Sequence, residues 1–236
     1  MNIEQIEHEK LIESLNDETC LATYKAQYAT YRPGLVPRLL GGIFVGAGNL
    51  VYGKRPSYLK FRAIEVIARV PYHSWTSALF TLLTVFYSDE KRALKLSTLS
   101  QFTTFAANNE TMHVVVVSAL AHKHHRAGYI RHSLIPVLFS FFYFWMSYLL
   151  YLIHPKWSLE LNYLFEHHAF IQYSEFIESR KEKLCREPIE SEFLTWYGRN
   201  PRSEYEFFRS VRNDELVHRN RSIHEIGLFM HSLDRW

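Results

Sequence analysis

Four glutamates lie inside segments that are otherwise apolar, which is a costly place for a carboxylate unless a positive group compensates it. They are Glu65, Glu110, Glu166 and Glu215. The second and fourth are each followed three residues later by a histidine, His113 and His218 respectively. Residues i and i+3 share a helix face, so each carboxylate and imidazole can converge on one ion.

The order along the chain is therefore Glu, Glu-x-x-His, Glu, Glu-x-x-His, with intervals of 45, 56 and 49 residues between successive glutamates. This is the ligand set of di-iron and di-manganese carboxylate bundles, in which each of four helices brings one glutamate. Four carboxylates neutralise two divalent ions, and two imidazoles leave positions open for oxygen. Chance alone gives about one Glu-x-x-His pair in a chain of this composition. The signal therefore comes from the apolar setting and spacing of the glutamates.

The elements that carry these residues are expected to be helices, because long apolar segments are separated by short polar turns and strand signals are weak. The candidates are 58–86, 91–122, 130–153, 157–183 and 204–231, with one or two shorter helices before residue 50. The predicted fold class is all-α, a ferritin-like four-helix bundle with a di-metal centre and extra membrane-docking helices. Residues 1–20 are expected to form an acidic N-terminal tail, either helical or disordered, and residues 21–236 a single domain.

The near-neutral net charge of +3 excludes a highly charged disordered chain and gives no case for a nucleic-acid partner. This total conceals three zones, with net charges of −5 over residues 1–20, +11 over 21–156 and −3 over 157–236. A basic section that also holds the apolar segments suits an anionic membrane surface, and a solvated basic face is the alternative. Two cysteines provide no disulfide framework.

Three segments of the chain are apolar, and we expect those at 35–53 and 130–153 to dock on a membrane. Residues 70–88 and 132–155 contain no Asp, Glu, Lys or Arg, and the second is long enough to span a bilayer. That segment could equally be a buried or interfacial helix. Residues 35–53 are apolar apart from Arg38 and contain five glycines, which predicts an irregular or short amphipathic element. The tract from His122 to Arg126 looks like a metal-binding sequence, but beside an apolar helix it favours contact with lipid phosphate or simple solvation.

At the four glutamates the sequence resembles the alternative oxidase family, which consists of membrane-associated di-iron quinol oxidases. The matching motifs are Ile64-Glu65-Val66, Asn109-Glu110-Thr111-Met112-His113, Phe165-Glu166-His167-His168-Ala169 and Arg212-Asn213-Asp214-Glu215-Leu216-Val217-His218. The resemblance spans about residues 55–225. It implies two iron ions held by the six residues Glu65, Glu110, His113, Glu166, Glu215 and His218.

The resemblance also implies roles for further residues. Tyr173 aligns with a tyrosine involved in electron transfer, and Asn109 and Asp214 align with groups that hold the ligands in place. The positions of the family's quinone site are occupied by Lys60, Ile64, His168 and Gln172. Lys60 stands where the family has Arg, His168 where it has Glu, and Gln172 where it has Thr. These changes alter the shape and charge of the reductant site.

The function implied is that of a quinol oxidase that reduces oxygen to water without pumping protons. The family further implies a homodimer docked on one leaflet of a membrane. Because the first 18 residues resemble neither a secretory signal nor a transit peptide, we expect the cytoplasmic face of a bacterial inner membrane rather than a mitochondrial inner membrane. Two alternatives stay open: a di-iron monooxygenase acting on a quinone precursor or another lipophilic substrate, and a helical membrane protein in which the Glu and His residues are only structural.

Overall fold

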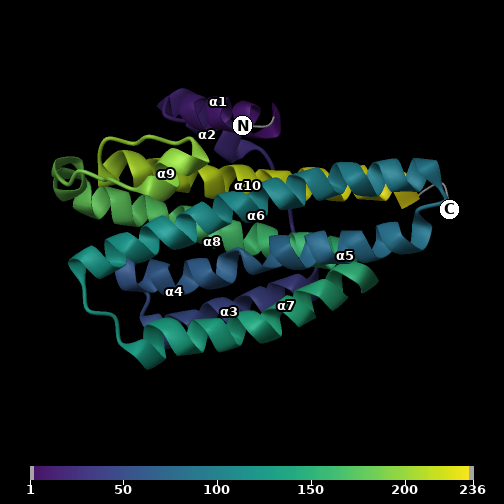
Figure 1. The fold of residues 1–236 in the computed structure, drawn as a ribbon, viewed down its shortest axis with the longest axis horizontal. Helices are drawn as coiled ribbons and strands as arrows, with labels where there is room; N and C mark the ends of the chain where they lie inside the picture. Colours follow the sequence, from purple (N-terminus) through teal and green to yellow (C-terminus); the bar gives the residue numbers. More distant parts are fainter. Residues whose placement is uncertain (1–2, 234–236) are drawn as a thin grey trace. The chain divides into compact units, whose positions relative to one another are not determined.

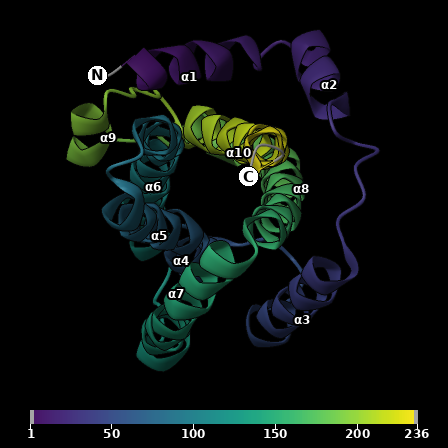
Figure 2. The same ribbon diagram turned by 90° about the vertical axis from the view of Figure 1, so that its right-hand side faces the viewer.

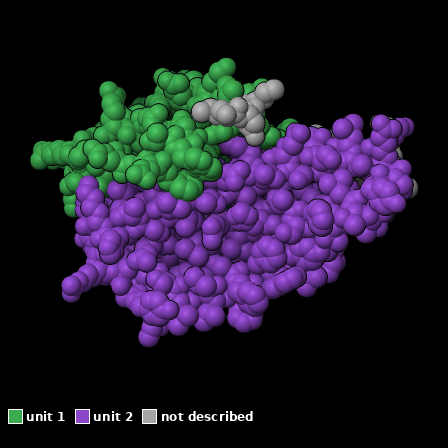
Figure 3. All heavy atoms as spheres, in the orientation of Figure 1, with its two compact units in different colours: residues 1–57, 160–228 green, residues 58–159, 229–236 purple. Residues whose placement is uncertain are grey.

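The computed structural model describes residues 3–233, and within them every regular element is helical (Figure 1). The prediction of an all-α fold is therefore confirmed. The chain divides into two compact units, residues 1–57 with 160–228 and residues 58–159 with 229–236, called unit 1 and unit 2 below (Figure 3). The prediction of a single domain over residues 21–236 stays a prediction.

Unit 2 is built on a long helix, α6 (Glu90–His124), against which α4 (Tyr58–Ala68) and α5 (Val70–Phe86) pack. The rings of Tyr58 and His124 lie 4.8 Å apart, and those of Tyr72 and Phe102 lie 6.0 Å apart. Residue numbers rise along α4 and α5 while those of their partners on α6 fall, so α6 runs antiparallel to α4 and α5. This pairing fixes which residues of α4 face α6.

The helix predicted over 58–86 is divided at Arg69, where α4 has ended and α5 begins with a proline in its first turn. Pro71 supplies no backbone N–H for a bond to the carbonyl four residues earlier and its ring crowds that carbonyl, so the division has a local cause. The next predicted helices are confirmed, with small shifts at their ends. Asp89 caps α6 by accepting a hydrogen bond from the backbone N–H of Arg92 at 3.1 Å.

The last helix of unit 2, α7 (Ile135–Ile153), follows a short π-helix, η1 (Ile130–Leu134), and packs on α4 and α5. The Ser74 hydroxyl donates to that of Ser147 at 2.8 Å, and the Trp75 ring lies 5.4 Å from that of Tyr151. These contacts use one face of α7. The opposite face carries exposed apolar side chains, among them Phe142, Trp145 and Leu149.

Unit 1 is centred on α8 (Pro155–Arg186) and α10 (Glu204–Leu233), which lie side by side in Figure 2. Asn162 donates to Ser222 at 3.1 Å, and the rings of Phe176 and Phe208 lie 4.9 Å apart, so these two helices are antiparallel. Thus each unit contains one antiparallel helix pair that carries predicted metal ligands. Around the pair of unit 1 lie α1 (Ile3–Ser14), α2 (Glu18–Ala26), α3 (Leu35–Tyr52) and α9 (Glu192–Tyr197).

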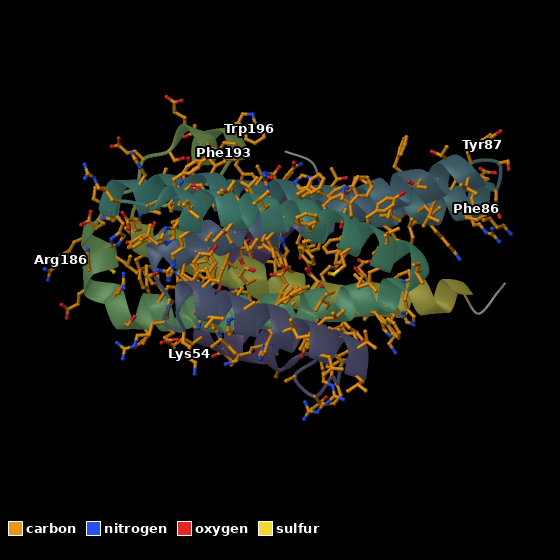
Figure 4. All side chains as sticks on the ribbon, turned by 90° about the horizontal axis from the view of Figure 1, so that it is seen from below. Lys54, Phe86, Tyr87, Arg186, Phe193 and Trp196 are labelled. Carbon is orange, nitrogen blue, oxygen red and sulfur yellow. The ribbon has the colours of Figure 1, made fainter. Side chains whose placement is uncertain are left out.

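The prediction of an irregular or short element at residues 35–53 was wrong, because α3 is one continuous helix of 18 residues. Packing overrides the low helix propensity of its glycines. A Cβ placed on Gly41 would lie 3.2 Å from the Leu164 side chain on α8, so this glycine allows a close approach of the two helices. Helix α9 was not anticipated; its exposed Trp196 packs on Phe193 with ring centres 5.0 Å apart (Figure 4).

Two helices are long and apolar enough to cross a membrane by length and composition, namely residues 35–52 and 130–153. Only 11% and 17% of their most apolar windows are buried. A buried core helix is therefore a poor description of either, which narrows the alternatives left open for 132–155.

Candidate metal ligands

Unit 2 brings together three of the predicted ligands, Glu65 from α4 and Glu110 and His113 from α6. The Nδ1 atom of His113 lies 3.5 Å from Glu110 Oε2 and 3.7 Å from Glu65 Oε2. One ligand atom from each of the three lies within 4.8 Å of the others, and all three side chains are buried. The structure therefore brings these three residues together, and their role as metal ligands stays a prediction.

The local reason is the buried stripe of α6, which repeats every three or four residues from Thr103 through Ala106, Glu110, His113 and Val117. Glu110 and His113 both fall in this stripe. The antiparallel pairing with α4 brings Glu65 opposite His113. Two carboxylates are therefore held in an apolar interior by the same periodicity that buries their aliphatic neighbours.

Unit 1 brings together the other three predicted ligands, Glu166 from α8 and Glu215 and His218 from α10. Their ligand atoms also lie within 4.8 Å of one another, and the three side chains are buried. Asn162, one turn before Glu166, donates its amide N–H to Glu166 Oε1 at 3.0 Å. The same amide donates to Ser222, whose hydroxyl donates to the backbone carbonyl of His218 at 2.9 Å.

The donor chemistry of both trios fits a di-metal cofactor. Each trio offers two carboxylates and one imidazole, an oxygen and nitrogen set that suits iron or manganese in the divalent state. Two carboxylates that share a buried space repel each other unless a cation compensates them. Because each unit supplies one such trio, the six residues match the two halves of the ligand set of a di-metal carboxylate protein.

Asp214 lies next to Glu215 and is held by residues from outside its own helix. Its Oδ1 accepts a hydrogen bond from His8 Nε2 on α1 at 2.7 Å and one from Arg199 Nη2 at 3.0 Å. Burial lowers the pKa of Arg199, but Asp214 and Glu9 offset this and leave the pKa raised. The guanidinium therefore stays charged, and Asp214 has a cationic partner inside the unit.

The other two residues to which the resemblance gave a role beside the metal are also buried. Asn109 precedes Glu110 on α6 and is fully inaccessible. Tyr173 lies on α8, two turns after Glu166, and its ring lies 6.1 Å from that of Phe208 on α10. Seven residues correspond to about two helical turns, so Tyr173 and Glu166 share one face of α8. Their roles stay predictions.

The four predicted quinone-site residues form two pairs, each on one helix face. Lys60 and Ile64 lie four residues apart on α4, and His168 and Gln172 lie four residues apart on α8. Lys60 and Gln172 are buried, whereas Ile64 and His168 are half-buried. A buried lysine is unusual in a protein interior. Their assignment to a substrate site stays a prediction.

Sequence reasoning missed the contacts that join α10 to residues far away in the sequence. Besides His8 and Arg199, Arg219 donates from Nη2 to the backbone carbonyls of Lys25 at 2.8 Å and Gln27 at 3.0 Å. Burial lowers the pKa of Arg219. The only signal in the sequence was the position of Arg219 directly after a predicted ligand, and its partners near α2 lie almost 200 residues away.

A helical protein with two trios of buried carboxylate and imidazole groups fits the class of di-metal carboxylate proteins. The family model described as alternative oxidase matches residues 4–227, and the chain belongs to the alternative oxidase family. This family is membrane-associated.

A curated relative supports the same relationship. The chain is 24% identical over 182 residues to a protein of Arabidopsis thaliana named ubiquinol oxidase 4, chloroplastic/chromoplastic. The match covers 69% of this chain and 49% of that protein, so the chain spans about half the length of this curated relative. No solved structure matches the chain at a significant level.

Proposed function

We propose that this chain is a quinol oxidase that couples the oxidation of quinol to the reduction of oxygen to water without pumping protons. The observation that carries the proposal is the pair of buried trios, since both have the residue types of the alternative oxidase motifs. Two quinols supply four electrons and four protons, which balance the conversion of one oxygen molecule to two waters.

We infer that the six residues of the two trios hold two iron ions. When bound, such ions supply the electron exchange with oxygen that side chains alone do not provide. The chain's contribution is to keep water out and to fix the ligands. Asn162 does this for Glu166, because its amide hydrogen bond leaves the carboxylate one orientation on the face of α8.

We also infer that the Tyr173 phenol donates an electron and a proton during oxygen reduction, as the family resemblance implies. Lys60, Ile64, His168 and Gln172 would bind the quinol headgroup. The ammonium of Lys60 offers hydrogen-bond donors to a quinol oxygen but not the planar fork of an arginine. Quinol affinity should therefore depend on Lys60 as a charge and tolerate its replacement by Arg.

The deciding experiment combines iron analysis with oxygen uptake driven by ubiquinol in the presence of cyanide. We expect two irons per chain, two quinols consumed per oxygen, and loss of both iron and turnover in Glu166→Ala. The exposed Glu175→Gln variant of the same helix is the matched control and should retain both. Oxygen uptake that yields a hydroxylated product would instead indicate the monooxygenase. Wild-type protein without iron would indicate a structural role for the six residues.

For the membrane, we propose that α3 and α7 lie in the surface of one leaflet. On α3 the exposed apolar side chains Leu35, Leu39 and Ile43 recur every four residues, which is the stripe of an interfacial helix. The apolar face of α7 is equivalent in character. On the basis of the family resemblance, we further propose that the protein lies on the cytoplasmic face of a bacterial inner membrane and forms a homodimer. Sedimentation of the detergent-solubilised protein tests the homodimer.

A basic tract over residues 123–131, which runs from the last turn of α6 into η1, supports an anionic lipid surface. Lys123, Arg126 and Arg131 are exposed, and residues 111–159 contain no Asp or Glu. Each basic residue near an anionic surface contributes roughly 1 kcal/mol, so replacing all three by Ala should weaken binding to vesicles containing phosphatidylglycerol about a hundredfold. The matched control replaces three basic residues at the other end of α6, Lys91, Arg92 and Lys95. Equal losses in both variants would contradict docking through the tract.

A further inference from the structure

Helix α1 packs on the part of α10 that carries the ligands Glu215 and His218. Ile12 and Leu15 of this helix form a buried cluster with Val217. Asn213 donates its side-chain amide to the backbone carbonyl of Ile12 at 3.1 Å. The acidic segment at the start of the chain is therefore a structural part of unit 1 and lies behind the ligand-bearing turn.

Charge complementarity holds α1 in this place. Glu9 accepts two hydrogen bonds from Arg199, at 3.0 Å from Nε and 2.6 Å from Nη2. Glu4 lies 3.6 Å from the guanidinium of Arg221 on α10. The negative charge that the sequence concentrates in residues 1–20 thus meets arginines of the C-terminal section, and this fixes the register of α1 along α10.

His8 lies at the centre of this interface and contacts two residues of the ligand-bearing turn, Asp214 and His218. Its Nε2 donates to Asp214 Oδ1 at 2.7 Å, and its ring stacks on that of His218 with centroids 6.0 Å apart and planes 30° apart. Asp214 is itself held by Arg199. Asp214 therefore sets the orientation of the His8 ring, and the His8 ring in turn limits the rotamers open to His218.

We propose that His8 is a positioning residue for the ligand His218, so that the docking of α1 controls how firmly the trio of unit 1 binds metal. The proposal rests on the proposed function, in which this trio holds iron. An imidazole already confined to one rotamer loses less freedom when it binds a metal. Groups that orient metal ligands change metal affinity by about 10–100-fold when they are removed.

The test compares iron affinity, measured by competition with a chelator, in full-length His8→Ala and His8→Gln. The glutamine amide can still donate to Asp214, so His8→Gln keeps the fold while removing the ring. We expect both variants to bind iron about 10–100-fold more weakly. The exposed Glu7→Ala variant on the same helix is the control and should bind as the wild type does. A folded His8→Gln protein with wild-type iron affinity overturns the proposal.

A spectroscopic measurement separates positioning from general loss of stability. Cobalt(II) bound to the trio has visible absorption bands that depend on its ligands, and we expect these bands to change in His8→Gln but not in Glu7→Ala. A wild-type chain that binds no iron would defeat the proposed function itself. A wild-type chain with two irons beside a His8→Gln chain with the same affinity and spectrum defeats only the positioning role.

Discussion

Replacing Glu110 by glutamine should stabilise the protein without metal and destabilise it relative to the wild type once iron is supplied. In unit 2 the carboxylates of Glu65 and Glu110 share a buried space and offer ligand atoms within 4.8 Å of each other. Two unit charges at that separation repel by about 3.5 kcal/mol at an effective dielectric constant of about 20. The nearby His113 offsets part of this repulsion. We therefore expect Glu110→Gln to raise the free energy of unfolding of the apoprotein by about 1–3 kcal/mol.

The assay is chemical denaturation of wild type and variant, each with chelator and with excess iron. A metal present at 100 times its dissociation constant stabilises the folded state by about 2.7 kcal/mol. The wild type should gain about this amount and Glu110→Gln very little, so the order of stability should reverse on adding iron. The comparison is sensitive because the two side chains have nearly the same shape and differ in charge.

Glu160 provides the contrasting control, because it is also buried but its carboxylate is satisfied by hydrogen bonds within the protein. It accepts hydrogen bonds from the Tyr31 hydroxyl at 2.6 Å and the Gly34 backbone N–H at 3.2 Å. Burial and this carboxylate raise the pKa of Tyr31, so the phenol keeps its proton and remains a donor. Glu160→Gln should cost about 1.5–3 kcal/mol with or without iron. If Glu110→Gln lowered the stability of the apoprotein as Glu160→Gln does, Glu110 would be structural and the metal-ligand reasoning refuted.

Three further predictions concern single sites. Arg199→Ala should lower the free energy of unfolding in chemical denaturation by about 3–5 kcal/mol, because it leaves the buried carboxylate of Asp214 uncompensated. Arg202→Ala removes an exposed side chain and should leave stability unchanged, so equal effects of the two variants would contradict this reasoning. Gly41→Val should lower the free energy of unfolding by about 1–3 kcal/mol, because the new side chain would press on Leu164 of α8. Gly42 has open space around it, so Gly42→Ala should not destabilise the protein, and a neutral Gly41→Val would disprove the close approach. Tyr173→Phe should lose oxygen-reducing turnover in quinol-dependent oxygen uptake while retaining iron, and unchanged turnover would remove Tyr173 from the reaction.

The helices and the two trios could be predicted because their signals are local. A buried stripe that repeats every three or four residues identifies α6, and the spacing between Glu110 and His113 places both in that stripe. The division at Arg69 was also visible in principle, because Pro71 follows it. Helix α6 follows α5 after a short connection and packs antiparallel to both α5 and α4, and this pairing sets which residues of α4 face α6.

The supporting contacts could not be predicted, because they join residues far apart in the sequence. His8 and Asp214 are separated by 206 positions, and no periodicity relates them. The continuous helix α3 was missed for a similar reason: its glycines have low helix propensity, and only the presence of Leu164 opposite Gly41 explains why one of them is useful. An acidic segment that looked like a tail has arginine partners that become visible only when the chain is folded.

Burial of a carboxylate is by itself a poor guide to a metal ligand in this protein. Glu160 and Glu225 are only 2% and 3% exposed, close to the 0–2% of the predicted ligands. Glu160, however, accepts hydrogen bonds from Tyr31 and Gly34, and Glu225 pairs with Arg221. Among the side chains that the structure describes, residues 4–227, neither belongs to a group of carboxylate and imidazole atoms that could share an ion. The distinguishing property is a second carboxylate and an imidazole at ligand distance in the same buried space. That arrangement is unfavourable without a cation, and this chain repeats it in both units. The two trios are therefore able to bind metal, and the proposed metal binding would offset the cost that their buried carboxylates impose on the apo form.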